Sequence, residues 1–363
     1  MHTLERGESY PHRKHGFYTK GEARKRVQRF FCKSCERTFS QQTFSTTYYL
    51  KKPDLLRFIA AGLNSCSANR QIARNLECAP STVTRLSARL GRHAMLLQAH
   101  ALNEIQHITE TLTFDHFETF AYSQDQPVGI GTLIGHTSWF VYDVDPAPHR
   151  IGGRRTPAQK AKAARRRQQQ VPPHSHAQSF SRSIDAIASK VPEGERITTI
   201  TDDHPGYRRA MATHPASDCI EHRIFPNVKR GPKGSPRTRQ AIQRDNAMFP
   251  VDLMHGLVRH TCADHRRETI AFGRRVNAVL ERFFLTSVWR NFVKWRSERK
   301  PDRSTPAMAL GLTTEPWPWS RVFAQRLFVK RIQPSDAWMK IYRRDWITPA
   351  VGRNHRHTLA NAY

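Results

Sequence analysis

The chain has 363 residues, with 59 Lys and Arg against 30 Asp and Glu and a formal net charge of +29. This length is typical of two or three domains, and a hydrophobic share of 38% is enough for at least one core of ordinary size. Such a basic excess indicates a polyanionic partner, most often nucleic acid. Short proteins that coat DNA or accompany ribosomes are the alternative, but with 7 Trp, 9 Tyr and 19 Phe this chain is more aromatic than they usually are.

The sequence predicts a protein of a reducing cytoplasm. No stretch of about 18 apolar residues occurs, so no transmembrane helix is expected. The N-terminus, MHTLERGESYPHRKHG, has no apolar centre and is not a secretory signal. Six cysteines in a chain of this length do not make a disulfide framework.

Residues 1–48 form a polar, basic segment that is a candidate zinc-binding element. Cys32 and Cys35 have the spacing that lets two thiolates share one Zn²⁺. No cysteine precedes them, so the other two ligands would be His12 and His15, which have the same spacing. The alternative is a segment that has lost one pair of ligands and binds no metal.

Residues 49–100 have a helical pattern and are predicted to form an all-α helix-turn-helix domain. Within them, residues 67–91 predict two helices joined by a turn at 77–80, with Ser81 capping the second helix. A helix-turn-helix places its second helix in the major groove of DNA, although any short helical hairpin has the same pattern. The predicted inner positions are Ile72, Ala73, Leu76, Val83, Leu86 and Leu90, and the predicted DNA-binding residues are Arg70, Arg74, Ser81, Thr82, Thr84 and Arg85.

Residues 101–300 are predicted to form an α/β domain. The pattern predicts strands within 109–145 and at 197–202 and 218–225, and helices at 180–190, 204–213 and within 241–298. Residues 301–363 are predicted to be an irregular tail, whose tryptophans pack rather than stack on bases.

Two basic stretches interrupt this domain, an insert at 150–175 and a turn-rich linker at 229–239. Their cations would hold phosphates in a salt-dependent and sequence-independent way, and the alternative is a pair of solvated loops. The DNA-binding candidates in the linker are Lys229 and Arg230. The other cations of these stretches are Arg154, Arg155, Arg165, Arg166, Arg167, Lys233, Arg237 and Arg239.

Two acids occupy strand positions in this basic chain. Asp115 lies within the aromatic strand LTFDHFETF, where a carboxylate is costly unless it is paired or bound to metal. Asp202 ends the β-branched run ITTIT. Carboxylates on neighbouring strands can share a pair of Mg²⁺ ions that promotes phosphodiester chemistry. A lone strand-end Asp is more often a turn former, and Asp203 is predicted to cap the helix at 204–213.

The order of these elements resembles that of bacterial insertion-sequence transposases of the DDE type. The resemblance covers about residues 15–315. It rests on the strand with Asp115, the helix-turn-helix and the segments RFFCKSCERTFS (29–40), TDDHPGY (201–207), RRETIAFGRR (266–275), WRNFVKWR (289–296) and TPAMALGL (305–312).

The resemblance implies an α/β core with an RNase H-like mixed sheet and flanking helices. The implied activity is cleavage of DNA at the ends of a mobile element, followed by strand transfer into target DNA, with Mg²⁺ or Mn²⁺ as cofactor. The implied partners are double-stranded DNA, as terminal inverted repeats and as target, and further copies of the chain on that DNA. The implied location is the bacterial nucleoid.

The resemblance also implies a catalytic triad that binds the metal. Asp115 and Asp202 would be the first two acids, and counting back from Phe272 places the third at Asp252, with Arg259 as a DNA-binding residue behind it. The sequence predicts that Asp252 opens a helix, where the helix dipole favours an anion. Arg259 would then lie on the same side of that helix and could meet a phosphate.

Two departures from the family pattern concern the third acid. The family usually has Glu at this position and Asn where this chain has His255. Glu268 and Glu281 are therefore competitors for the role of Asp252, and for Glu281 an ordinary solvated helix face is the alternative. These departures keep two other functions open: a non-catalytic DNA-binding protein, either a decayed transposase or a regulator, and a nuclease without strand transfer.

Overall fold

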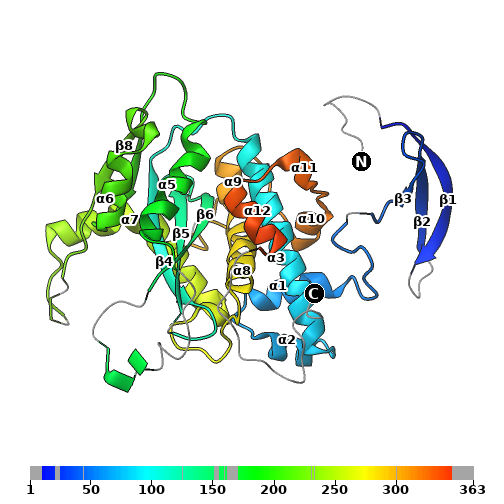
Figure 1. Cartoon of the computed structure of the whole chain (residues 1–363), viewed down its shortest axis with the longest axis horizontal. Coiled ribbons are helices and arrows are strands. Elements are labelled where there is room, and N and C mark those ends of the chain that lie inside the picture. The colour runs from blue at the N-terminus through cyan, green and yellow to red at the C-terminus, as the bar shows by residue number, and fades with distance from the viewer. Residues whose placement is uncertain are drawn as a thin grey trace.

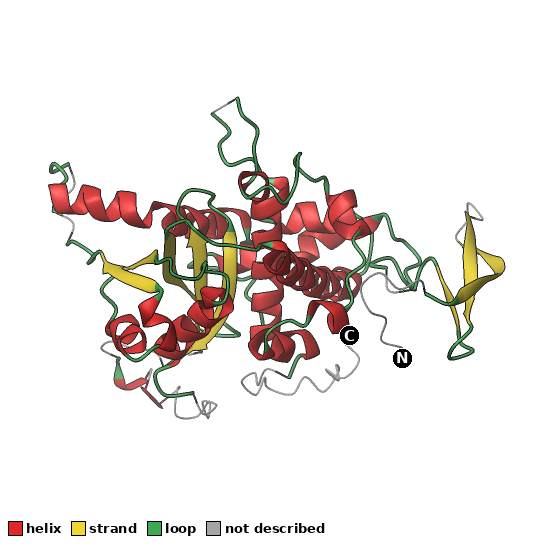
Figure 2. Ribbon diagram, turned by 90° about the horizontal axis from the view of Figure 1, so that it is seen from above, coloured by secondary structure: helices red, strands yellow, loops and turns green. Residues whose placement is uncertain are grey.

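The computed structural model consists of a three-stranded sheet, a helical part and a five-stranded mixed sheet that helices cover on both faces (Figure 1). The three-stranded sheet lies to one side of the rest (Figure 2). The predicted α/β class is therefore confirmed. The described residues are 10–20, 25–43, 45–124, 126–150, 155–158, 160–161, 171–229, 231–232, 234–299 and 301–345. The predicted phosphate contacts Arg154, Arg165, Arg166, Arg167, Arg230 and Lys233 lie outside them.

The N-terminal segment forms an antiparallel sheet that the sequence did not predict. Its strands are β1 (His12–Lys20), β2 (Lys25–Cys32) and β3 (Thr38–Ser40). Phe30 and Phe39 are cross-strand partners whose rings stack at 5.2 Å between centroids, and aromatic pairs of this kind stabilise a sheet. His12 pairs with Cys32 at one end of the sheet.

The helical part comprises α1 (Leu55–Leu63), α2 (Asn69–Asn75) and α3 (Pro80–Glu104). Of the predicted inner positions, Leu76 is partly buried and the other five are buried. The predicted cap at Ser81 is wrong, because α3 begins at Pro80 with Ala79 as its N-cap. Proline suits the first helical position, where an N–H has no partner within the helix. The 25 residues of α3 continue far beyond the motif and pack on α8.

The five-stranded sheet has the order β6-β5-β4-β7-β8. Its strands are β4 (Leu112–Phe120), β5 (Pro127–Gly135), β6 (Val141–Pro148), β7 (Ile197–Thr201) and β8 (Ile220–Ile224). Within this sheet, β5 is antiparallel to both β4 and β6, whereas β7 is parallel to β4 and β8 is parallel to β7. Parallel neighbours need crossover connections, which contain α5 (Ser175–Ala188), α6 (Pro205–Ala212) and the 3₁₀ turn at Pro215–Asp218.

Side chains of β4 alternate between the two faces of the sheet. On one face, Phe114 contacts Phe180 of α5 and Tyr207 of α6, with ring centroids 4.9 and 5.4 Å away. On the other face, Phe117 lies 5.7 Å from Phe283 of α8 (Val276–Val288). Asp115 shares the face of Phe117, and His116 shares the face of Phe114.

Two predicted helix ends differ from the structure. Helix α7 spans Arg239–Thr261 with Pro250 inside it, so Asp252 lies in the helix interior and does not open the helix. Proline removes one hydrogen bond, but the buried side chains of Met248 and Val251 anchor α7 on both sides of it. In α6 the N-cap is His204, whose Nδ1 accepts from the N–H of Gly206, and not Asp203.

Residues 301–363 were predicted to be an irregular tail. The described part of this segment, 301–345, instead contains four short helices, so the prediction is wrong for it. A 3₁₀ turn (Ala263–His265) precedes α8, and a π-helical turn (Trp289–Val293) follows it. Trp338 is buried and donates from Nε1 to the carbonyl of Val144 at 3.0 Å, so its predicted packing role is confirmed. No described helix combines the length and hydropathy needed to cross a bilayer. The remaining helices are α9 (Pro306–Ala309), α10 (Trp319–Ala324), α11 (Val329–Ile332) and α12 (Asp336–Arg343).

Candidate active site

Asp115 lies on β4, the central strand of the sheet, and Asp202 directly follows β7, the strand beside it. β4 and β7 are parallel, and Phe114 pairs with Thr201, so the next residue of each chain segment is one of the two acids. Oδ1 of Asp115 accepts from the N–H of His116 at 2.8 Å. Asp202 accepts from the N–H of His204 at 3.1 Å, which fixes the direction of its carboxylate.

Asp252 approaches this pair from α7, which packs on β4, β5 and β7. Its carboxylate is ion-paired with Arg244, about two turns earlier in the same helix, through contacts to both oxygens. The Asp252 side chain is 39% exposed, against 22% for Asp115. The third acid therefore lies at the open side of the site.

The charges of Asp202 and Asp252 both act on the carboxyl of Asp115. The pKa of Asp115 is raised from 3.8 to about 8, mainly by burial and in part by the charges of Asp202 and then Asp252. Carboxylates that repel one another in this way favour a bound cation. Oxygen donors of this kind suit Mg²⁺ or Mn²⁺, so the residues present fit the implied cofactor.

His255, which follows Asp252 on α7, also reaches this site. Nδ1 of His255 lies 3.9 Å from Oδ2 of Asp115, and Nε2 lies 3.3 Å from the hydroxyl of Thr132. Burial, and then the charge of Arg259, lower the pKa of His255 to about 3, so this imidazole is neutral near pH 7.

Arg259 is engaged inside the fold. Its guanidinium donates to the backbone carbonyls of Glu118 and His265 and lies 4.0 Å over the ring of Phe117. Burial, and then the charge of Arg267, lower its pKa to about 10. These contacts fix α7 against β4, so Arg259 positions the helix that carries the third acid.

The competing third acids lie elsewhere. Glu281, on α8, is buried and accepts from Arg344 through both oxygens at 2.8–3.1 Å, so the solvated face proposed as its alternative is wrong. Glu268 is exposed and lines a surface hollow with Cys66. Of these three candidates, only Asp252 perturbs the pKa of Asp115.

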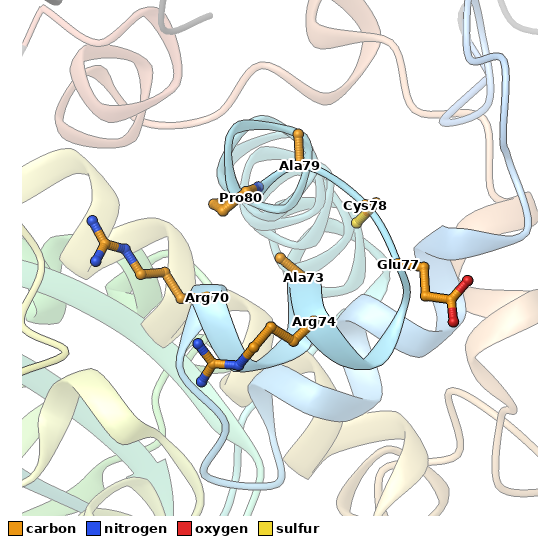
Figure 3. Close-up of a pocket in the computed structure, with 7 residues that line it drawn as sticks. All are labelled: Arg70, Ala73, Arg74, Glu77, Cys78, Ala79 and Pro80. Atoms are coloured by element: carbon orange, nitrogen blue, oxygen red, sulfur yellow. The ribbon is translucent and has the colours of Figure 1, made fainter.

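Two of the predicted DNA-binding residues, Arg70 and Arg74 of α2, line a shallow hollow of about 440 Å³ that extends to Pro80 at the start of α3. Arg70 and Arg74 extend from α2 to one side of it, whereas Glu77 points to the other side (Figure 3). Ser81 and Arg85 are exposed on the first turns of α3. Thr82 is partly buried, Thr84 accepts from Asn69 at 3.0 Å, and Lys229 is exposed after β8.

The four predicted zinc ligands do not gather into one cluster among the described residues. Cys32 is buried at the end of β2 and Cys35 is exposed. His12 makes a contact of 2.7 Å from Nδ1 to the carbonyl of Tyr10, and the ring of His15 faces Phe31 at 5.9 Å.

Sequence reasoning missed a second group of potential metal ligands. Glu118, His149 and His176 come from β4, the end of β6 and the start of α5, and their ligand atoms all lie within 4.8 Å of one another. Within the described ranges, the oxygens of the three aspartates do not form so tight a group. One signal was available: the two histidines directly border the basic insert at 150–175.

No protein-family model matches this chain, and no curated protein matches it either. The function is therefore inferred from the residues of the site and their geometry.

Proposed function

We propose that this protein is a DDE-type transposase with an RNase H-like core. One observation carries the proposal: Asp115 on β4 and Asp202 directly after β7 lie at neighbouring positions of two adjacent parallel strands, and Asp252 on α7 acts on the same carboxyl of Asp115. The strand order, with three antiparallel strands followed by two parallel ones, supports the same core. The position of the acids in a chain of net charge +29 is what metal-dependent chemistry on DNA requires.

The three aspartates would hold a pair of Mg²⁺ ions, which supply an activated nucleophilic oxygen and stabilise the leaving oxygen. The N–H of His204 and the amide of Asn227, which donates to Oδ2 at 3.0 Å, orient the carboxylate of Asp202. In the first step, water attacks phosphorus at the element end and the P–O3′ bond breaks, which frees a 3′-OH. In the second step, this 3′-OH attacks a phosphodiester of target DNA and displaces its 3′ oxygen, with no covalent bond to the protein.

Binding of DNA is assigned to the exposed surface of α2 and the first turns of α3. Arg70, Arg74 and Arg85 carry positive charge there, and Ser81 adds a short polar side chain. Side chains of this kind contact phosphates and base edges. Further copies of the chain on the terminal repeats would bring two element ends together.

A non-catalytic DNA-binding protein is the second candidate, and one observation favours it. Arg244 already neutralises Asp252 within α7, at the position where the third metal ligand is needed. A chain that has lost its metal site would retain such an ion pair and its basic surfaces. An active enzyme requires Arg244 to release Asp252 when metal and DNA bind.

The test is cleavage and joining of the DNA that flanks the gene, with Mg²⁺, Mn²⁺ or EDTA. Asp202→Asn is compared with Asp203→Asn, its exposed neighbour, which pairs with Arg208. We expect metal-dependent 3′-OH ends and joined products from the wild type and Asp203→Asn, and none from Asp202→Asn. Binding without cleavage in every lane would refute the enzyme and favour the second candidate.

A further inference from the structure

A second constellation of ligand atoms lies on the face of the sheet opposite to Asp115. Oε1 of Glu118 is 3.2 Å from Nε2 of His176, and Oε2 is 3.2 Å from Nε2 of His149. A zinc ion bound at about 2.0–2.2 Å by nitrogen and oxygen in a tetrahedral site separates neighbouring ligands by roughly 3.3 Å. The two contacts therefore have the separation of ligands to one ion.

The orientation of His149 supports a cation between these side chains. Its Nδ1 contacts the carbonyl of Ala147 at 3.1 Å, so this nitrogen carries the proton. In the neutral ring, Nε2 then presents a lone pair to the carboxylate of Glu118. Two acceptor atoms 3.2 Å apart need a proton or a cation between them. Histidine ligands of metals are typically oriented by such a contact from the second ring nitrogen to a carbonyl.

A buried histidine packs against this group. His116 is 6% exposed, its Nδ1 contacts the hydroxyl of Tyr207 at 2.5 Å, and its Nε2 has no hydrogen-bond partner. Its ring meets that of His176 edge to face at 4.6 Å. A buried polar atom of this kind indicates a missing ion or water.

Gly129 leaves room beside these groups. A Cβ at this position would lie 3.3 Å from Oε1 of Glu118, 3.3 Å from Nε2 of His176 and 3.2 Å from Cδ2 of His116. The carboxylate, the imidazole and the ring edge that carries the unpaired nitrogen therefore converge on one point of β5. Any larger residue at position 129 would crowd the ligand atoms.

We propose that Glu118, His149 and His176 bind a divalent ion of the zinc class. Two imidazoles and one carboxylate select Zn²⁺ over Mg²⁺, since Mg²⁺ prefers oxygen ligands. This site is distinct from the three aspartates and does not depend on the transposase proposal. Because His149 and His176 border residues 150–175, the ion joins both ends of the basic insert to β4.

The test is a titration of the metal-free, full-length protein with Co²⁺, in a Cys32→Ser/Cys35→Ser background that removes thiolate ligands. We expect one equivalent of Co²⁺ with the visible spectrum of a tetrahedral nitrogen and oxygen site, displaced by Zn²⁺ and not by excess Mg²⁺. His149→Asn/His176→Asn should lose this equivalent. His100→Asn, which alters an exposed His–Glu pair on α3, should keep it.

Two further measurements guard against a variant that fails to fold. Gly129→Ala retains every ligand and should weaken Co²⁺ binding about 10-fold, the scale of changes next to metal ligands. X-ray absorption of the zinc-loaded Cys→Ser protein, with all histidines intact, should show two imidazoles per ion. Retention of the equivalent by the double His variant, or a zinc spectrum without imidazole, would overturn the proposal.

Discussion

Replacement of Asp115 by Asn should stabilise the metal-free protein while it abolishes activity. The carboxyl of Asp115 is buried on β4 and faces Asp202 and Asp252, so its ionised form is disfavoured in the folded state. Burial, and then the charge of Asp202, raise its pKa from 3.8 to about 8. An amide of similar shape carries no charge and removes this repulsion.

The size and the pH dependence of the stabilisation by Asp115→Asn follow from the raised pKa of Asp115. Below about pH 4 the carboxyl is protonated in both states and costs nothing. Between pH 4 and 8 the unfolded chain loses the proton first, so the penalty on folding grows as the pH rises, and above pH 8 it is constant. A rise of the pKa from 3.8 to about 8 corresponds to a folding penalty of at most about 5 kcal/mol. Relaxation and water entry reduce this limit, and we expect about 2–4 kcal/mol at pH 8.

The assay is urea unfolding in EDTA at pH 5, 7 and 9, followed by tryptophan fluorescence. The free energy of unfolding of Asp115→Asn should exceed that of the wild type by a margin that grows from pH 5 to pH 9. Mg²⁺ should narrow this margin, because a cation stabilises only the wild-type carboxylates. Asp203→Asn serves as control, and its exposed ion pair is worth at most about 1 kcal/mol.

One outcome would refute this reasoning. If Asp115→Asn is no more stable than the wild type at pH 9, or if the difference does not change with pH, the carboxyl of Asp115 is not confined among the other acids. The metal site of the proposed transposase would then lose its electrostatic support.

Three further predictions concern other parts of the molecule. Arg344→Met should lower the free energy of unfolding by about 3–5 kcal/mol, because it leaves Glu281 buried and unpaired; an unchanged urea midpoint would contradict this. Asn291→Ala should cost about 1–3 kcal/mol and speed hydrogen exchange at the amide of Val141, which donates to the Asn291 side chain; an unchanged exchange rate would show that β6 does not need it. Arg85→Ala should weaken binding to all DNA sequences alike and reduce the slope of log affinity against log salt by about 1; a sequence-dependent loss would instead assign Arg85 to base contacts.

Much of the local structure could be predicted from residue patterns. The alternation around Asp115 and the run before Asp202 predicted two strands, and both occur with the acids at the expected positions. The apolar spacing of α2 and α3 predicted which of their faces is buried. These predictions succeed because periods of 2 and 3.6 residues depend only on neighbouring positions.

The predictions that were wrong concern features that depend on packing between segments distant in the chain. Asp252 was predicted to open a helix, yet it lies inside α7, which continues through Pro250 because side chains on both sides of the proline pack in the core. Glu281 was a candidate for the site, and only its partner 63 residues later shows that it belongs to the core.

The sequence by itself determined the chemical character of this protein: its basic charge, its strand-borne acids and the pattern of its helices. Tertiary structure alone decided which groups meet. Asn291 contacts Val141 from 150 residues away, and Glu118 meets His149 and His176 because a hairpin and a crossover helix end at the same place. Side chains so far apart in the chain come together only through strand register and packing, which local patterns do not encode.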